Sequence, residues 1–197
     1  IAVLIALAAC GVGAVCGIAG GMKRNEQAWR WSRIMAYTAF AAMTASIVLM
    51  EYALITNDFS VSYVAEVGST KTPLWVTMVS LWSSLDGSIL LWGLVLTGYI
   101  ATFAWKTKGK FQDHASWALG ISLMIGVFFT FLVSGIANPF EAMDPVPTEG
   151  PGPNPLLQNH ILMIIHPPAL YLGYVGMAVP FGMGCASLLV GRIGPAW

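Results

Sequence analysis

Residues 166–190 read HPPALYLGYVGMAVPFGMGCASLLV, and this stretch decides the class of fold. It holds no Asp, Glu, Lys or Arg, and it exceeds the roughly 20 apolar residues that carry an α-helix across a bilayer. His166 and two prolines stand at its start, directly after a proline-rich, acidic segment. A histidine at the mouth of a membrane span is well placed to ligate a metal, so the side of the membrane that it faces matters.

The whole chain has the composition of an integral membrane protein. Of its 197 residues, 57% are hydrophobic and only 9% are charged, and the mean hydropathy is +0.73. Soluble domains carry about 25% charged residues. The length allows about five spanning helices, and no basic block indicates nucleic-acid binding. We predict an all-α, polytopic membrane protein, with residues 1–197 as a single membrane domain and spans near 1–22, 34–55, 88–105, 117–136 and 167–190.

Basic residues predict the orientation of these spans. Of the nine Lys and Arg residues, only Lys71 falls on one side of the membrane. By the positive-inside rule, the other side is the cytoplasm. Residue 1 and two long loops, about 57–87 and 137–166, are then external. The residues on the predicted cytoplasmic side are Lys23, Arg24, Arg30, Arg33, Lys106, Lys108, Lys110 and Arg192.

The first external loop is expected to contain short ordered segments. Polar and apolar residues alternate from Asp58 to Ala65, which predicts an extended segment. Thr72 followed by Pro73 indicates a helix cap and a first helical position. Trp and Met residues at helical spacing follow, which predicts a helix along the membrane interface.

The second external loop is rich in proline up to residue 153. Asn154 followed by Pro155 predicts the start of an approach helix that reaches Ile165. His166 is expected to end it, because a residue before proline is disfavoured in a helix. Both prolines after His166 should then prevent a regular helix across it.

The chain is expected to be the N-terminal piece of a longer protein or of a split one. Ile1 already lies inside an apolar run, and Trp197 follows an unfinished loop. A signal peptide is a poor alternative, because no basic flank precedes the first apolar run. The cysteines lie in apolar runs without a C-x-x-C pair and are interpreted as small buried hydrophobes; they are Cys10, Cys16 and Cys185.

His166 has two interpretations from its position alone. It could cap the approach helix and bond a loop carbonyl, or it could offer a neutral imidazole to a metal, most naturally haem iron. His160, six residues earlier, lies on another helical face and is interpreted as interfacial. His114 lies in a cytoplasmic turn and is expected to be solvated.

Other candidate residues first have structural interpretations. Tyr171 and Tyr174 fit an aromatic belt at the membrane interface. Asp86 is expected to cap the third span rather than to catalyse. Glu51, a carboxylate near the outer end of the second span, could face an internal cavity.

Glycines predict where helices approach each other closely. Gly13, Gly17 and Gly21 form one smooth stripe on the first span. In the last span, several glycines and Pro180 predict a thin, bent helix; the glycines are Gly173, Gly176, Gly182 and Gly184. No phosphate-binding loop, nucleophile elbow or zinc pattern occurs in the sequence, and no catalytic residue is assigned.

Three segments of the chain resemble motifs of one family. Residues 57–65 read NDFSVSYVA, and residues 81–92 read LWSSLDGSILLW, with Asp86 where Glu is usual in the family. Residues 154–158 and 165–176 read NPLLQ and IHPPALYLGYVG. In order and spacing these segments resemble the CcmF/NrfE family, the membrane haem lyase subunits of cytochrome c maturation.

The resemblance implies a function and a site. Members of the family take haem from the periplasmic chaperone CcmE and hold it in an external pocket. The haem vinyl groups then form thioethers with the C-x-x-C-H cysteines of apocytochrome c. Two external histidines ligate the iron, and the first maps onto His166 as an axial ligand. Tyr171 and Trp82 are at most pocket lining. A second, buried haem b is ligated by residues outside this chain.

The resemblance also implies partners and a location. Besides CcmE and apocytochrome c, the implied partners are CcmH/CcmI-type subunits that handle thiols and the apocytochrome. The implied location is the bacterial inner membrane with a periplasmic functional face, rather than the mitochondrial inner membrane.

Residues 1–197 lack the tryptophan-rich motif W-G-x-x-W-x-W-D of the family, and the second external histidine and the ligands of the buried haem are expected elsewhere. We therefore expect that this piece alone does not attach haem, because one imidazole does not complete the axial coordination of iron. Two alternatives stay open: a scaffold that docks the chaperone and a partner subunit, or a haem transporter. Against transport, the charged and aromatic features cluster on the external face.

Overall fold

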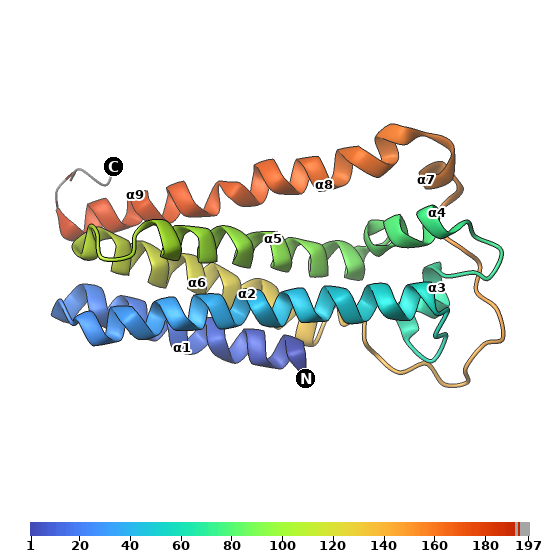
Figure 1. Ribbon diagram of the computed structural model, residues 1–197, viewed down its shortest axis with the longest axis horizontal. Helices are drawn as coiled ribbons and strands as arrows, with labels where there is room; N and C mark the ends of the chain where they lie inside the picture. The colour runs from blue at the N-terminus through green and yellow to red at the C-terminus, as the bar shows by residue number, and fades with distance from the viewer. Residues whose placement is uncertain (192, 194–197) are drawn as a thin grey trace.

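A computed structural model describes residues 1–191 and 193, and within them it is a bundle of long helices (Figure 1). Five helical segments are long and apolar enough to cross a membrane, so the predicted all-α, polytopic class is confirmed. Four of them are the single helices α1 (Ala2–Lys23), α2 (Glu26–Ile55), α5 (Leu85–Lys106) and α6 (Gln112–Ser134). The fifth, Ile164–Val190, combines most of α8 (Ile161–Gly176) with α9 (Ala178–Val190).

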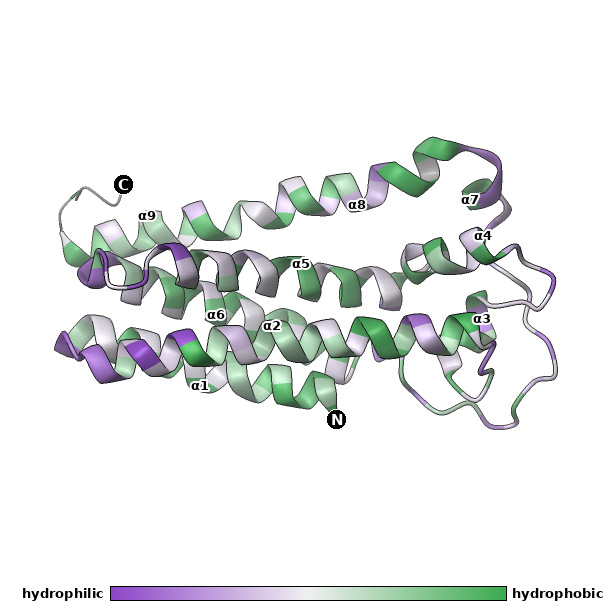
Figure 2. Ribbon diagram, in the orientation of Figure 1, coloured by the Kyte–Doolittle hydropathy of each residue, from purple (hydrophilic) through white to green (hydrophobic). Residues whose placement is uncertain are grey.

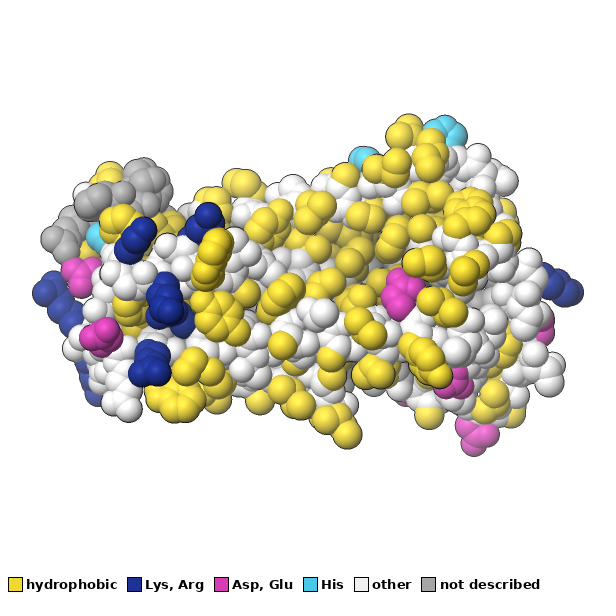
Figure 3. Space-filling model, viewed as in Figure 1, with side chains coloured by type: hydrophobic (Ala, Val, Ile, Leu, Met, Phe, Trp, Pro, Cys, Tyr) yellow, Lys and Arg dark blue, Asp and Glu magenta, His cyan; other side chains and the backbone are white. Residues whose placement is uncertain are grey.

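The two ends of the bundle differ in chemistry. Figure 2 shows apolar residues along the middle of the helices and polar residues at the ends. Lys and Arg side chains gather at the end where α1 meets α2 and α5 meets α6, which we call the basic end (Figure 3). The opposite end, the loop end, carries the short elements α3 (Ser62–Val67), α4 (Leu74–Val79), η1 (Ser80–Trp82) and α7 (Pro155–Asn159). Arg192, predicted to lie with the basic residues, is outside the described residues.

Helix α1 packs between α2 and α6 along its glycine stripe, as predicted. A Cβ atom on Gly17 would lie 2.6 Å from the Cα of Gly120 in α6, so the two backbones are nearly in contact. Two buried hydroxyls bond α1 carbonyls at the same crossings: Ser32 Oγ donates to Gly13 O at 2.7 Å, and Ser116 Oγ donates to Gly17 O at 2.8 Å. Small residues and hydroxyls of this kind hold membrane helices together.

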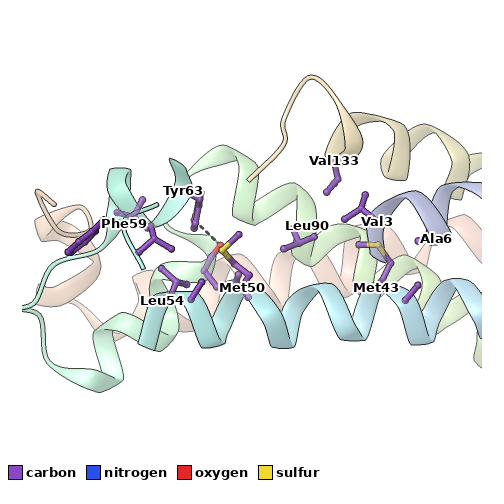
Figure 4. Close-up of a cluster of buried hydrophobic side chains, with 14 residues drawn as sticks. Val3, Ala6, Met43, Met50, Leu54, Phe59, Tyr63, Leu90 and Val133 are labelled. Atoms are coloured by element: carbon purple, nitrogen blue, oxygen red, sulfur yellow. Dashed lines mark hydrogen bonds between the residues drawn. The ribbon is translucent and has the colours of Figure 1, made fainter. Parts of the chain in front are cut away.

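Apolar side chains form two buried clusters along the bundle axis. The cluster nearer the loop end joins α1, α2 and α5 to Tyr63 of α3 (Figure 4). The second lies nearer the basic end and is built largely from alanine and leucine. Cys10 is fully buried in it, as predicted, whereas Cys16 and Cys185 are half-buried.

Two predictions about the basic end were wrong. Helix α2 begins at Glu26 rather than near 34, because Asn25 caps it by accepting a hydrogen bond from Ala28 N at 3.1 Å. The polar turn is therefore largely helical. His114 is only 4% exposed instead of solvated. Helix α6 already begins at Gln112, so His114 lies within its first turn, and α6 packs on α1.

The first loop also differs from the prediction. Instead of an extended segment over Asp58–Ala65, it contains the helix α3, and only Val61 forms a β-bridge, with Ala142. The predicted interfacial helix exists as α4, but Pro73 occupies its N-cap position, and Thr72 makes no capping hydrogen bond. An alternation of polar and apolar residues over only eight positions does not exclude a short helix that is stabilised by contacts with residues distant in sequence.

The two loops at the loop end hold each other. Ser62 N donates to Glu141 O at 2.8 Å, and Met143 N donates to Ser60 O at 2.8 Å. Further along, Glu149 accepts hydrogen bonds from the Thr70 hydroxyl and from Thr70 N, the latter at 2.9 Å. These bonds lower the pKa of Glu149 from its ordinary value of 4.5 to about 2. The loops therefore form one cap over the bundle.

Acidification is expected to release the Thr70–Glu149 contact. Because folding lowers the pKa of Glu149, its carboxylate stabilises the contact above pH 4.5 and stops doing so as the pH falls toward about 2. The carboxylate is fully exposed, so the contact is local rather than a determinant of global stability. Protection of the Thr70 amide from hydrogen exchange measures it. Glu149→Ala should abolish that protection at neutral pH, and Asp144→Ala, in the same loop, should not; equal protection in both variants would contradict the assignment.

The last span corrects the expectation that Pro167 and Pro168 prevent a helix. Helix α8 runs through both prolines, and His166 lies inside it rather than at its end. The two prolines remove two backbone hydrogen bonds, but their fixed φ is itself helical, and such losses are tolerated in membrane helices. The helix is interrupted further on, at Met177 between α8 and α9. Pro180 explains it, since its missing N–H leaves the carbonyl four residues earlier without a helical partner.

Candidate haem-handling site at the loop end

The approach to the last span is built from two helices rather than one. Asn154 caps α7, as predicted, by accepting a hydrogen bond from Leu156 N at 2.9 Å. Helix α7 stops at Asn159, and His160 adopts an extended backbone with φ of −142°. The His160 Nδ1 then accepts a hydrogen bond from Leu162 N at 3.2 Å and so caps α8. The capping role considered for His166 therefore belongs to His160.

His166 is exposed on α8, one and a half turns into the helix. Among the described residues, it takes part in no hydrogen bond or ion pair. Residues three, four and seven positions later share its helical face, and they too are exposed: Ala169, Leu170 and Gly173. A Cβ on Gly173 would meet no atom within 4 Å. Figure 3 shows histidine side chains on the outer edge of the molecule over α7 and α8.

The opposite face of α8 is attached to α5 by aromatic side chains. Trp92 of α5 contacts the rings of Tyr171 and Tyr174, with centroid separations of 5.3 and 5.8 Å, and also Phe129 of α6 at 5.4 Å. We call Trp92, Phe129, Tyr171 and Tyr174 the aromatic group. Tyr171 is half-buried, and its hydroxyl donates to Ser88 Oγ at 3.2 Å. The ring of Tyr171 therefore packs in the α5–α8 contact, whereas Tyr174 is 69% exposed.

The indole of Trp82, predicted at most to line a pocket, packs against the apolar cluster near the loop end. Its Nε1 is buried and has no hydrogen-bond partner in the described part of the chain. The Trp82 carbonyl, in contrast, accepts a hydrogen bond from Ser88 Oγ at 3.2 Å. The structure therefore brings Tyr171 together with the Trp82 backbone through Ser88.

Packing explains the glycine in the Asp-Gly-Ser sequence at the start of α5, which the sequence pattern alone did not. A Cβ on Gly87 would overlap the Leu81 carbonyl oxygen and the Tyr63 ring. Tyr63 is buried and donates to the carbonyls of Ser80 and Leu81 at 2.8 and 2.9 Å, and burial raises its pKa. Asp86 does not cap α5. It lies in the first helical turn, where a carboxylate interacts favourably with the helix dipole. Ser84 occupies the N-cap position.

The remaining carboxylates do not form a metal centre. Within the described residues, no group of three or more His, Cys, Asp and Glu side chains could hold an ion. Glu66 accepts a hydrogen bond from Ser84 Oγ at 2.8 Å, which is a structural use. Glu51 is half-buried on α2, and its Oε2 has no partner among the same residues. A metal bound by His166 must therefore bring its own ligand set, as haem iron does with its porphyrin nitrogens.

Comparison with known proteins assigns the class. Residues 82–193, which include α5, α6 and the histidine-bearing helix α8, match the family described as cytochrome C assembly protein. The chain belongs to this family. Among solved structures it is similar to cytochrome c haem lyase CcmF, with a TM-score of 0.84 and 36% identity over 97% of this chain and 30% of that one. The predicted relation to the CcmF/NrfE family is therefore confirmed.

Curated relatives agree with this assignment. The cytochrome c-type biogenesis protein CcmF of Haemophilus influenzae is 36% identical over 90% of this chain, and that of Escherichia coli is 37% identical over 82%. The biogenesis protein NrfE of Haemophilus influenzae is 32% identical over 86% of the chain. The chain spans 28%, 25% and 27% of these relatives' own lengths.

Proposed function

We propose that this chain is the part of a cytochrome c haem lyase that holds haem at the loop end, with His166 as one axial ligand of the iron. The observation that carries the proposal is the placement of His166. Its imidazole is exposed on α8 and takes part in no hydrogen bond with other described residues, while the neighbouring His160 caps the helix. A neutral imidazole that performs no structural task is available to a metal.

The loop end is proposed to face the periplasm of a bacterial inner membrane. Cytoplasmic loops carry an excess of Lys and Arg, and the basic end holds all the described basic residues except Lys71. With the basic end in the cytoplasm, α7 and the first turns of α8 lie on the outer surface. His166 then meets haem delivered from the periplasmic side by a chaperone such as CcmE.

The surface around His166 suits a flat, apolar substrate. Leu162 and Leu170 lie one turn before and after His166 on the same face, and they are 59% and 51% exposed. Gly173 continues this face with open space above its backbone. A porphyrin lying against this face covers apolar side chains that are otherwise exposed, which favours binding. The residues present therefore fit haem as a substrate.

In the proposed reaction, haem supplies its two vinyl groups. Each cysteine thiol of a C-x-x-C-H segment adds across one vinyl group, so a carbon–sulfur bond forms and the thiol hydrogen moves to the other vinyl carbon. The role of His166 is to fix the iron, and with it the plane of the macrocycle. The second iron ligand, the aromatic platform, the buried haem b and the docking of CcmH/CcmI-type subunits and apocytochrome c are assigned to the rest of the protein and its complex.

The haem content of the full-length protein, purified from membranes, tests the proposal. His166→Ala should lose the haem of the loop end, because the iron loses a protein ligand. His160→Asn is the matched control: it removes the neighbouring imidazole and keeps a capping side chain, so its haem content should stay that of the wild type. Full retention of haem in His166→Ala would favour a scaffold, with the chemistry elsewhere.

A further inference from the structure

The segment that carries His166 is weakly held by its own helix. Pro167 and Pro168 remove two of the backbone hydrogen bonds that would stiffen this turn of α8. Ile165 and His166 are exposed, Ile165 at 55%, and the two prolines are only half-buried. The direction in which the imidazole points therefore depends on where α8 is attached to the rest of the protein.

Among the described residues of α8, Tyr171 is the side chain nearest to His166 that makes a hydrogen bond or a ring contact with another element. Its ring meets Trp92 edge-on at 5.3 Å with an interplanar angle of 62°, and its hydroxyl bonds Ser88. Tyr171 lies five positions after His166, which places the two side chains roughly 140° apart around the helix. Tyr171 can therefore fix the helix from behind while His166 faces outward.

The Tyr171 hydroxyl begins a directed chain of hydrogen bonds. Tyr171 Oη donates to Ser88 Oγ, and Ser88 Oγ donates to the Trp82 carbonyl, both at 3.2 Å. Each hydroxyl has one proton to donate, so the two bonds are compatible and polarise each other. The chain ends on η1, where Ser80 and Leu81 are buried. It thus connects α8 to a buried part of the loop end.

We propose that Tyr171 is a positioning residue for His166, acting through the Tyr171–Ser88–Trp82 hydrogen-bond chain and the Trp92 ring to set the orientation of the imidazole toward haem iron. The proposal rests on the function proposed above. It gives the aromatic group a role beyond packing. The Trp92 ring contacts both Tyr171 and Tyr174, and within the described residues only Tyr171 of these two has a hydroxyl bonded to another element. A second tyrosine, Tyr99, attaches α8 nearer the basic end by donating to Leu172 O at 3.0 Å.

The test removes one oxygen atom and keeps the ring. In the full-length protein, Tyr171→Phe should lower the affinity of the loop-end site for haem about tenfold, the smaller end of the range for losing an outer-shell partner. It should also shift the electron paramagnetic resonance g values of the ferric haem, which report the orientation of axial imidazoles. Ser88→Ala should cause the same two changes, and the double variant should change little more than either single one, because they break one chain.

Tyr174→Phe is the matched control. Its ring contacts the same Trp92, and its hydroxyl has no hydrogen bond within the described residues. In Tyr174→Phe, the haem affinity and the g values should remain those of the wild type. If Tyr171 only packs, Tyr171→Phe should leave both quantities unchanged as well. Unchanged values in both Tyr171→Phe and Ser88→Ala would overturn the positioning role. If His166→Ala also keeps its haem, the proposed function fails; if only His166→Ala loses it, the function stands and the positioning role alone is wrong.

Discussion

Replacing Gly17 with alanine is expected to destabilise the bundle more than a typical surface substitution. The new methyl group would lie 2.6 Å from the Cα and 2.7 Å from the N of Gly120. Both are backbone atoms of α6, so no side chain can rotate away and the two helices must separate. Overpacking of this kind costs about 1–3 kcal/mol. Thermal unfolding of the detergent-purified, full-length protein, followed by circular dichroism, measures the loss.

Gly11→Ala provides the matched control on the same helix. A Cβ there would meet no atom within 4 Å, and alanine favours a helix over glycine by about 1 kcal/mol. Its unfolding temperature should stay unchanged or rise. If both variants unfold at the wild-type temperature, the close approach of α1 and α6 at Gly17 is wrong.

Replacing His166 with alanine is expected to abolish most formation of c-type cytochrome in cells. The iron would lose a direct ligand, so the effect should exceed the roughly 10–100-fold that is typical of losing an outer-shell partner. The reason is geometric, because an unligated macrocycle does not present its vinyl groups in one orientation to the two thiols. A haem stain of cell extracts, read by the intensity of c-type cytochrome bands, measures the yield.

His160→Asn again separates an imidazole effect from a helix effect. It preserves the cap on Leu162 N, so cells carrying it should make c-type cytochromes near the wild-type level. Equal loss in both variants, with the protein present in the membrane, would show that the α7–α8 junction matters as a structure and that His166 has no special chemistry.

The spans could be predicted from sequence because a bilayer allows few alternatives. A segment in lipid must form all its backbone hydrogen bonds within itself, so a long apolar run is sufficient to predict a spanning helix. The glycine stripe of α1 could likewise be predicted as a helix contact from its four-residue spacing. The ends of the helices were harder. Asn25 starts α2 within a stretch of charged residues, which reads as a turn until its cap is seen.

The loop end could not be predicted because distant residues decide its structure. Helix α3 is fixed by Tyr63, which bonds carbonyls of η1 some 17 and 18 positions later. Gly87 in the first turn of α5 is required because a Cβ there would overlap the Leu81 carbonyl oxygen and the Tyr63 ring. The position of Tyr171 against Ser88 joins residues 83 apart in sequence. His166 was singled out from the sequence as a candidate ligand, but local rules placed it at a helix end instead of within α8.

The central claim is that the His166 imidazole coordinates the iron of haem at the loop end. It is tested most directly by the absorption spectrum of full-length His166→Ala, supplied with haem, before and after addition of free imidazole. The account predicts that the spectrum of the loop-end haem changes in the variant and returns toward that of the wild type with imidazole, which replaces only the missing nitrogen. A wild-type spectrum in the variant without imidazole would contradict it.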